Sequence, residues 1–525
     1  MRKTNLHKAV QHASEIEIMP VDLIEFNSSG RLLIVGRAQQ ILAVTPHLSG
    51  LIISAVITDD ETVVNNDNIT LINDRITTID GWLGEFSVQF ESQQLKVDLV
   101  LDLSEQAIMT AAVLPLGYFA PQDNAQVLVE TLQQLPDLVG TFDKPRYFNY
   151  KASICAHSRR QLSGCEQCLN ACPADAIISS GDTVTVNPSL CQGCGSCTAV
   201  CPSGAISYAL PTLDVSLNRA RKMIQAWFEF ETVAPHIVIH DLEQGQLLID
   251  NMGESLANNI LTFSIEEIGA LSMPFWLSVL AYGASGITVW DAGSHRNHSW
   301  LELQQEIDKT NQMLIGMGYE QQLVNWLTTN DFSQLNSHLS TTNSLEGMQT
   351  ATFAGIEDKR RMISIALEHL HKHAPKTIDV LALDEQSAFG KIKVNTKTCT
   401  LCHSCVSVCP VGAVLDGVDQ PQLNFIEDLC VQCGLCETAC PEDAIGLVPR
   451  YLFDREQARK VTLLHEEAVF NCISCDKPFA TKKMIDTMMD KLKGHSMFQG
   501  AALDRLKMCE DCRVKAMFKN SQGPM

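Results

Sequence analysis

The arrangement of cysteines constrains this chain more than any other feature, because closely spaced thiol groups usually fold around metal. The chain has 20 cysteines among 525 residues. A Cys-Pro pair followed by two residues and then Ala-Ile or Ala-Val occurs four times, beginning at Cys172, Cys201, Cys409 and Cys440. An internal repeat of this kind indicates that one structural unit is used several times.

Three of the four repeats complete the spacing C-x2-C-x2-C-x3-C-P. They are Cys191, Cys194, Cys197 and Cys201; Cys399, Cys402, Cys405 and Cys409; and Cys430, Cys433, Cys436 and Cys440. Three thiolates on a tight loop can wrap three corners of a cubane cluster, and the fourth, followed by proline, can reach the other cluster of a pair. The spacing therefore predicts paired 4Fe–4S clusters and disfavours zinc in these two regions.

These motifs resemble those of the bacterial two-cluster ferredoxins, whose fold is a pseudo-twofold βαββαβ unit. The resemblance implies two such modules, at residues 150–210 and 391–450. In the second module it implies two ligand sets, namely Cys399, Cys402, Cys405 and Cys440, and Cys430, Cys433, Cys436 and Cys409. In the first module it implies a set formed by Cys191, Cys194, Cys197 and Cys172.

The remaining set departs from the ferredoxin pattern. Cys165, Cys168 and Cys172 keep their spacing, but Leu162 stands where a cysteine is expected. The nearest candidate is Cys155, which has nine residues between it and Cys165 in place of two. We predict that an insertion lets Cys155 complete a fourth cluster with Cys165, Cys168 and Cys201. The alternative is that Cys155 is not a ligand and the site holds three irons.

The last four cysteines form two C-x2-C pairs, Cys472 with Cys475 and Cys509 with Cys512. Four thiolates supplied in this way most often hold a structural zinc ion, with a single iron as the rival. We therefore predict a zinc-ribbon-like domain at residues 459–525, with a helix over 482–492 between the two pairs.

The cysteine-free parts indicate further domains, so we predict an α+β or α/β multidomain fold. Residues 1–145 read as a β-rich or α/β domain of unknown role, with strands at 32–35, 51–57, 69–72, 86–90 and 97–101 and a helix at 124–135. Residues 213–330 read as an α/β domain, with helices at 218–230 and 300–317 and strands at 236–240 and 247–249. Residues 331–390 are predicted to contain a linker and a helix. The polar stretch 328–344 reads as the linker, and the helix is expected at 356–372.

One stretch, residues 268–290, carries no charge and is long enough to cross a bilayer. It also contains Pro274, Gly283 and Gly286, which interrupt a single span. We predict a buried helix at 271–282, a turn, and a strand at 287–290, and no membrane span.

The formal net charge of −22 excludes a broad electrostatic surface for nucleic acid and disfavours binding to anionic lipid. No apolar export signal is visible at the N-terminus, and tight C-x-x-C runs favour metal over disulfides. A cytoplasmic protein is expected.

The segments 268–277 and 282–289 resemble the delta subunit of methyl-viologen-reducing hydrogenases. Where that family has cysteines, this chain has Glu267 and a cysteine-free loop after Asp291, so the resemblance implies a degenerate delta-like domain without its redox centre. The combination of modules is similar to multi-cluster ferredoxin-like proteins associated with proteobacterial formate dehydrogenases. That resemblance implies formate dehydrogenase as the redox partner.

The sequence thus predicts an iron–sulfur electron-transfer protein that carries single electrons through four clusters and has no catalytic residues of its own. Two alternatives remain open. The chain could be a subunit of a flavin-dependent or heterodisulfide-reductase-like oxidoreductase, or it could be a redox-sensing or assembly factor.

Overall fold

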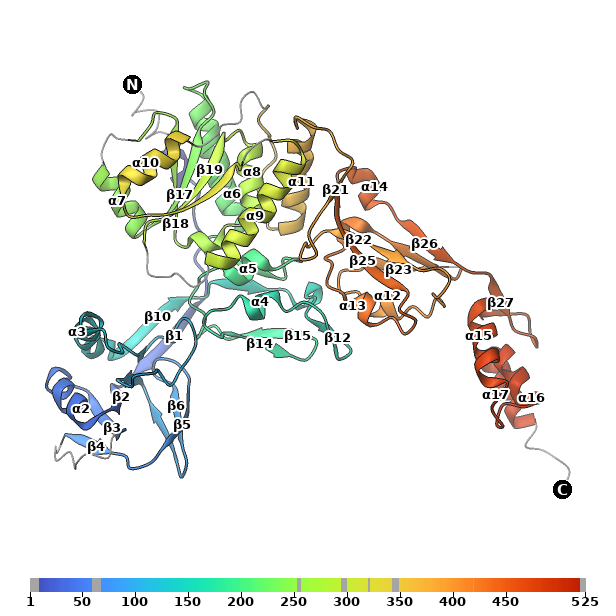
Figure 1. The fold of residues 1–525 in the computed structure, drawn as a ribbon, viewed down its shortest axis with the longest axis horizontal. Helices are drawn as coiled ribbons and strands as arrows, with labels where there is room; N and C mark the ends of the chain where they lie inside the picture. Colours follow the sequence, from blue (N-terminus) through green and yellow to red (C-terminus); the bar gives the residue numbers. More distant parts are fainter. Residues whose placement is uncertain are drawn as a thin grey trace.

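The computed structural model describes residues 9–58, 68–252, 256–293, 300–319, 322–341, 349–418 and 420–519. The chain forms an elongated molecule (Figure 1). The N-terminal and middle domains occupy one end, with the first cysteine-rich region between them. The second cysteine-rich region follows, and the C-terminal segment lies at the opposite end.

A parallel five-stranded sheet in the order β4-β3-β2-β8-β9 organises the N-terminal domain. Its strands are β2 (Arg31–Gly36), β3 (Ile52–Ile57), β4 (Ile69–Leu71), β8 (Leu99–Asp102) and β9 (Tyr118–Phe119). Helices α2 (Ala38–Val44) and α3 (Ala125–Gln134) contribute to the hydrophobic core on one face of this sheet. The antiparallel strands β5 (Ile76–Asp80), β6 (Phe86–Phe90) and β7 (Gln94–Val97) pack on the other face. Strand β1 (Leu23–Ser28) pairs with β10 (Gly140–Pro145).

The predicted strand at 97–101 is wrong in one respect, because it is two strands with Asp98 between them. The Asp98 side chain is 1 % exposed and accepts hydrogen bonds from the backbone N–H groups of Ser29 (2.9 Å) and Arg31 (3.0 Å). A buried carboxylate needs such donors, and they hold the chain at the point where β7 ends and β8 begins. The other four predicted strands and the helix at 124–135 are confirmed.

The middle domain is built on a parallel sheet in the order β18-β17-β19-β20. The strands are β17 (His236–Asp241), β18 (Ile260–Ile265), β19 (Gly286–Asp291) and β20 (Val324–Thr328). The helices are α6 (Leu213–Phe228), α8 (Met273–Ala281), α9 (Trp300–Gly316) and α11 (Lys359–Lys372). Every residue of α8 is buried, and β19 follows it, so the prediction for the uncharged stretch is confirmed. Among the described residues, no helix is both long and apolar enough to cross a membrane.

Two predictions for this domain are wrong. Residues 247–249 are not a strand but part of α7 (Gln244–Met252), whose start is held by the Asp241 carboxylate through the N–H groups of Glu243 and Gly245. The part of the predicted linker that the structure describes, residues 328–341, is not a linker, since it contains α10 (Phe332–Thr341), and residues 342–344 lie outside the described residues. Phe332, Leu335 and Leu339 lie at helical spacing and pack into a buried cluster with Trp290, which the polar residues around them concealed.

The two cysteine-rich regions contain the same order of elements. The first has β11 (Phe148–Tyr150), α4 (Gln167–Asn170), β14 (Ile177–Ser180), β15 (Thr183–Val186), α5 (Ser196–Val200) and β16 (Ile206–Tyr208). The second has β22 (Gly390–Val394), α12 (Ser404–Val408), β23 (Val414–Asp416), β24 (Gln422–Phe425), α13 (Leu435–Thr438) and β25 (Ile445–Leu452). In each region the first strand pairs antiparallel with the last and the two central strands form a hairpin. The first region has an additional hairpin, β12 (Ser158–Arg159) with β13 (Leu162–Ser163).

The C-terminal segment joins the second region through β26 (Thr462–Glu466), which pairs with β24. It continues with the hairpin of β27 (Val469–Asn471) and β28 (Pro478–Thr481) and with α15 (Lys482–Leu492), α16 (Ala501–Asp504) and α17 (Glu510–Lys519). The helix predicted at 482–492 is confirmed.

Candidate metal centres

Cys155, Cys165, Cys168 and Cys201 line one small cavity, and we refer to them as group B. Cys155 ends the short 3-10 turn Ala152–Ile154, Cys165 follows the additional hairpin, Cys168 lies in α4, and Cys201 ends α5. The nine residues between Cys155 and Cys165 contain that hairpin, so the insertion returns Cys155 to the same cavity as the other three.

Cys399, Cys402, Cys405 and Cys440 line a second cavity, and we call them group D. Cys399 and Cys405 are buried, whereas Cys402 is exposed. Of all cysteines in the two cysteine-rich regions, Cys402 alone falls in the exposed class.

Group A consists of Cys172, Cys191, Cys194 and Cys197. Burial raises the pKa of the Cys197 thiol well above its usual value, and the neighbouring thiols of Cys194, Cys191 and Cys172 raise it further. Group C consists of Cys409, Cys430, Cys433 and Cys436. Burial likewise raises the pKa of Cys436, with further contributions from Cys430, Cys433 and Cys409. In both groups the four cysteines are close enough to influence one another electrostatically.

The Cys-Pro repeat has a structural reason that the sequence alone did not reveal. The backbone N–H of the repeated alanine donates to the cysteine sulfur in three repeats, from Ala176 to Cys172 (3.3 Å), Ala413 to Cys409 (3.2 Å) and Ala444 to Cys440 (3.2 Å). The residue before the alanine has a positive φ in all four repeats: Asp175 (49°), Gly204 (71°), Gly412 (66°) and Asp443 (45°). Aspartate and glycine tolerate this left-handed conformation, which turns the following N–H toward the sulfur.

Buried cysteines with N–H donors close to their sulfur atoms are suited to hold a metal cluster that binds thiolates. Burial raises the pKa of Cys168 to about 12 and that of Cys405 to about 12, so these side chains are neutral at pH 7 unless a cation replaces the proton. The N–H groups that point at sulfur stabilise the thiolate that an iron–sulfur cluster requires. Each of the four groups therefore offers the type and the number of donor atoms that a 4Fe–4S cluster requires.

The four groups also neighbour one another in a definite order. Burial is the largest cause that raises the pKa of Cys197, Cys433 and Cys436, and in each case a cysteine of the next group adds to it. The charge of Cys168 in group B raises the pKa of Cys197 in group A, and the charge of Cys165 in group B raises the pKa of Cys433 in group C. Cys405 of group D acts on Cys436 of group C. The order of adjacency is therefore A, B, C, D.

Lys144 and Tyr208 contact the loop of group A, and the sequence did not predict either contact. The Lys144 amine donates to the carbonyls of Ser189 (2.8 Å) and Cys191 (2.8 Å), and the Tyr208 hydroxyl donates to the carbonyl of Gly193 (2.8 Å). The Lys144 contacts join residues 45 and 47 positions apart, the Tyr208 contact joins residues 15 positions apart within the first cysteine-rich region, and no local pattern signals them.

The middle domain also contacts group A. A Cβ atom added to Gly269 would lie 2.2 Å from the carbonyl oxygen of Cys194, and one added to Gly195 would lie 2.4 Å from the nitrogen of Ala270. Glu267 is 4 % exposed, and its carboxylate is among the groups that influence the Cys194 thiol. Glu267 and Gly269 of the middle domain therefore lie beside the cysteine loop that contains Cys194.

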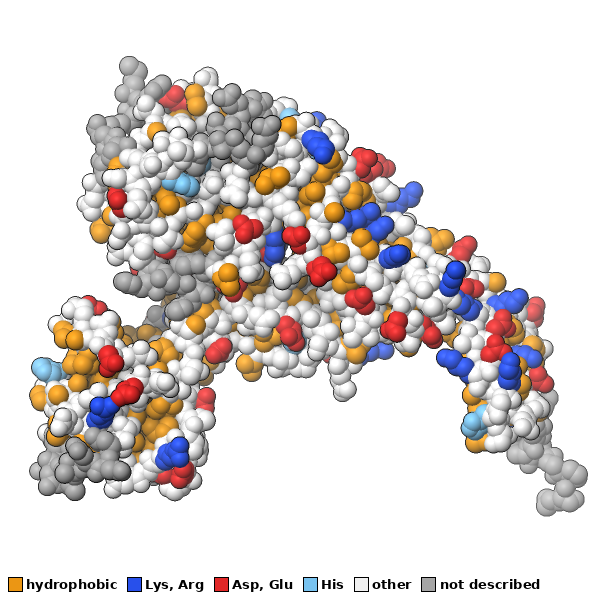
Figure 2. Space-filling model, in the orientation of Figure 1, with side chains coloured by type: hydrophobic (Ala, Val, Ile, Leu, Met, Phe, Trp, Pro, Cys, Tyr) orange, Lys and Arg blue, Asp and Glu red, His pale blue; other side chains and the backbone are white. Residues whose placement is uncertain are grey.

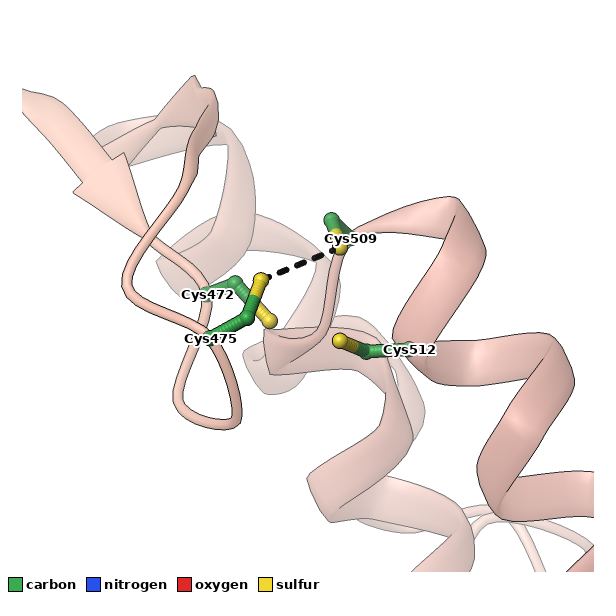
Figure 3. A group of neighbouring side chains, drawn as sticks. All are labelled: Cys472, Cys475, Cys509 and Cys512. Carbon is green, nitrogen blue, oxygen red and sulfur yellow. Dashed lines mark hydrogen bonds between the residues drawn. The ribbon is translucent and has the colours of Figure 1, made fainter.

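The last four cysteines form a separate cluster. The sulfur atoms of Cys472, Cys475, Cys509 and Cys512 all lie within 4.8 Å of one another. Figure 3 shows two of them on the loop that follows β27 and two at the start of α17, with the side chains turned toward a common centre. Desolvation opposes ionisation of the Cys472 thiol, yet backbone N–H groups, that of Cys509 foremost, lower its pKa to about 6. This arrangement fits a tetrahedral four-thiolate ion site.

Comparison with known proteins identifies the type of both cysteine-rich regions. Residues 398–445 match the model of the 4Fe-4S dicluster domain, and residues 184–207 match that of the 4Fe-4S binding domain. The chain is 48 % identical over 42 residues to the protein named Ferredoxin 7Fe of Hydrogenibacillus schlegelii, covering 8 % of this chain and 51 % of that protein. It is 32 % identical over 114 residues to an uncharacterised ferredoxin of Methanocaldococcus jannaschii, covering 20 % of this chain and 57 % of that protein.

The chain thus spans about half the length of the curated relatives it matches. Among solved structures, a chain of the formate dehydrogenase, heterodisulfide reductase and formylmethanofuran dehydrogenase complex of Methanospirillum hungatei aligns at 15 % identity and a TM-score of 0.18. The alignment covers 63 % of this chain and 91 % of that chain. The matches of the two cysteine-rich regions establish an iron–sulfur protein with ferredoxin-type 4Fe–4S domains.

Proposed function

We propose that this iron–sulfur protein is a cytoplasmic electron-transfer protein, or redox subunit, that carries single electrons through four 4Fe–4S clusters. The observation that carries the proposal is the gathering of sixteen cysteines into four neighbouring groups in the order A, B, C, D. When bound, clusters of this type accept and release one electron at a time. The chain contributes the thiolates, the N–H donors and the order of the sites.

The proposed ligand sets follow the four groups. Group A would hold a cluster with Cys172, Cys191, Cys194 and Cys197, and group B with Cys155, Cys165, Cys168 and Cys201. Group C would hold one with Cys409, Cys430, Cys433 and Cys436, and group D with Cys399, Cys402, Cys405 and Cys440. In this proposal residues 150–210 and 391–450 are two-cluster ferredoxin modules, and the shared cavity supports Cys155 as the fourth ligand of group B.

We assign zinc to Cys472, Cys475, Cys509 and Cys512, in a domain at residues 459–525. The close approach of four sulfur atoms on short loops supports a closed structural site. Iron in the same site remains the rival, and metal analysis separates the two.

The partner proposed for this chain is a redox protein, with formate dehydrogenase as the first candidate because of the sequence resemblance. The exposed Cys402 marks group D as the site from which a partner could be reached. The acidic net charge of −22 favours a partner with a basic docking surface. On the face that Figure 2 shows, acidic and basic side chains are intermixed over the C-terminal part, so no basic surface for nucleic acid is evident there.

Metal content tests the central proposal. Four clusters and one zinc site require about sixteen irons and one zinc per chain in anaerobically reconstituted protein. About twelve irons or fewer would contradict the assignment of four clusters. Anaerobic affinity capture from cell extract, followed by identification of the bound dehydrogenase, tests the partner, and recovery without any redox enzyme would count against it.

A second candidate function has one observation in its favour. A cavity of about 1030 Å³ lies beside group B, lined by Cys201, by residues of α9 and α11 and by residues 381–389. Small-molecule sites commonly have volumes of about 300 to 1000 Å³, so a flavin or a substrate would fit there. Flavin absorbance in anaerobically purified protein would favour the flavin-dependent oxidoreductase, and its absence from protein with full iron content would favour the electron carrier.

A further inference from the structure

Helix α11 packs in the core of the middle domain, yet its first two residues contact both cysteine-rich regions. Met362, Ala366 and Leu367 anchor the helix among buried residues of that core. The Lys359 amine reaches the first region, where it donates to the carbonyls of Thr198 (2.9 Å) and Ala199, just before Cys201 of group B. The middle domain thereby fixes the position of group B.

Arg360 extends this contact to the second region. One terminal nitrogen donates to the carbonyls of Pro202 (3.4 Å) and Ala388 (3.0 Å), and the other donates to those of Asp428 (3.1 Å) and Cys430 (3.0 Å). Pro202 follows Cys201 of group B, and Cys430 belongs to group C. The Arg360 guanidinium therefore connects the backbone beside group B with the backbone beside group C, the two middle groups in the order A, B, C, D.

The additional hairpin forms a second contact at the same junction. Its last strand, β13, lies beside α13 of the second region. A Cβ atom added to Gly164, which follows β13, would lie 2.8 Å from Cγ of the fully buried Leu435 and 2.6 Å from the carbonyl oxygen of Ala156. The residues inserted between Cys155 and Cys165 thus also bring group B against the second region.

Arg360 carries a positive charge that the nearby Asp358 carboxylate offsets only in part. Its hydrogen-bond acceptors are neutral carbonyls, and its guanidinium stacks on the Phe389 ring at 4.6 Å from the ring centre. Burial lowers the pKa of Arg360, but a guanidinium stays protonated in proteins. The Arg360 side chain is half-buried, so water screens its positive charge only in part, and the charge strengthens the binding of an added electron nearby.

We propose that Arg360 is the positioning residue of the junction between the two ferredoxin regions: it holds groups B and C together and raises the electron affinity of both. The proposal rests on the proposed function. It goes beyond that function by naming the residue that controls the relative position and the electron affinity of groups B and C. Reduction at either group adds one electron, forms or breaks no bond, and leaves Arg360 protonated.

The test compares Arg360→Gln with the matched control Arg361→Gln in the full-length protein loaded with iron. Arg361 is the next residue and equally charged, but its side chain is exposed. In redox titrations followed by electron paramagnetic resonance, we expect Arg360→Gln to lower the electron affinity of two clusters by about tenfold, or about 60 mV. Arg361→Gln should leave all four potentials unchanged, and Arg360→Lys, which keeps the charge, should recover most of the shift.

Gly164→Val tests the same junction without touching Arg360, in case the arginine variant does not assemble. Its side chain would meet both Leu435 and the Ala156 carbonyl, so the magnetic interaction between clusters of the two regions should weaken when it is measured in variant protein that has full iron content. The inference is wrong if Arg360→Gln with full iron content has the potentials of the control, or if Gly164→Val leaves the interaction unchanged. Low iron content of the unaltered protein would instead contradict the proposed function.

Discussion

The two cysteine-rich regions contain the same elements in the same order, yet they differ in their surroundings. The first lies between the N-terminal and middle domains and carries an additional hairpin, whereas the second is joined to the C-terminal segment through the pairing of β24 with β26. Gly195 and Gly434 occupy matching places, with φ of 79° and 81°, after the second cysteine of a repeat. Gly195 packs against the backbone of Ala270, and a Cβ on Gly434 would meet nothing within 4 Å. The same glycine of the motif thus packs against another domain in the first region and has open space beside it in the second.

The difference shows why the first region could depart from the regular spacing. A cluster site needs four sulfur atoms around a common centre, and the chain between them is free to vary if it returns to that centre. Between Cys155 and Cys165 the chain forms a hairpin that also contacts the second region. The departure in sequence is therefore a change in packing between domains, while Cys155 still lines the same cavity as Cys165, Cys168 and Cys201.

The largest expected effect tests whether the irregular and regular regions are equivalent as cluster sites. Cys155→Ala and Cys399→Ala should each lower the iron content below about sixteen atoms per chain, by about one atom where the remaining three thiolates keep a three-iron cluster and by about four where the cluster is lost. Iron and sulfide analysis of anaerobic protein measures this. Ser163→Ala, in the hairpin, is the control and should keep full iron content. Full iron content in Cys155→Ala would show that group B is completed in another way.

A smaller effect should distinguish Gly195, which packs against the middle domain, from Gly434, which has open space beside it. Gly434→Ala places alanine in a left-handed conformation, which costs about 1 to 2 kcal/mol. Gly195→Ala has the same cost and in addition a clash with the Ala270 backbone, which adds about 1 to 3 kcal/mol. Amide hydrogen exchange around α5 and α13 measures the free energy of local opening. Equal losses in both variants would contradict the contact between the middle domain and group A.

The smallest effect concerns a feature that the two regions share. Asp175 and Asp443 have positive φ before the alanine of a Cys-Pro repeat, and both side chains are exposed. Asp175→Gly and Asp443→Gly relieve backbone strain, so each should stabilise its turn by about 0.5 to 1 kcal/mol, with the same sign in both regions. Hydrogen exchange of the Ala176 and Ala444 amides provides the measurement. Opposite signs would show that the turn itself depends on its surroundings.

Much of the site could be predicted from the sequence, because cluster ligands follow one another at fixed spacings. The cysteine pattern alone identified both ferredoxin-type regions, which the family matches confirm. Most strands and helices were also predicted, since their apolar residues follow a regular period. Helices α7 and α10 were missed because short apolar runs among polar residues do not distinguish a helix from a strand or a linker.

The sequence by itself determined which side chains could hold metal, since the chemistry of a thiolate and the spacing of its neighbours are local properties. The tertiary structure decided which cysteines lie together and in what order the four groups follow one another. It also brought Lys144, Glu267 and Arg360 to the cysteine loops from distant parts of the chain. Such contacts depend on how separate domains pack, and packing leaves no periodic signal in the sequence. For that reason the central position of Arg360 emerged only from the folded molecule.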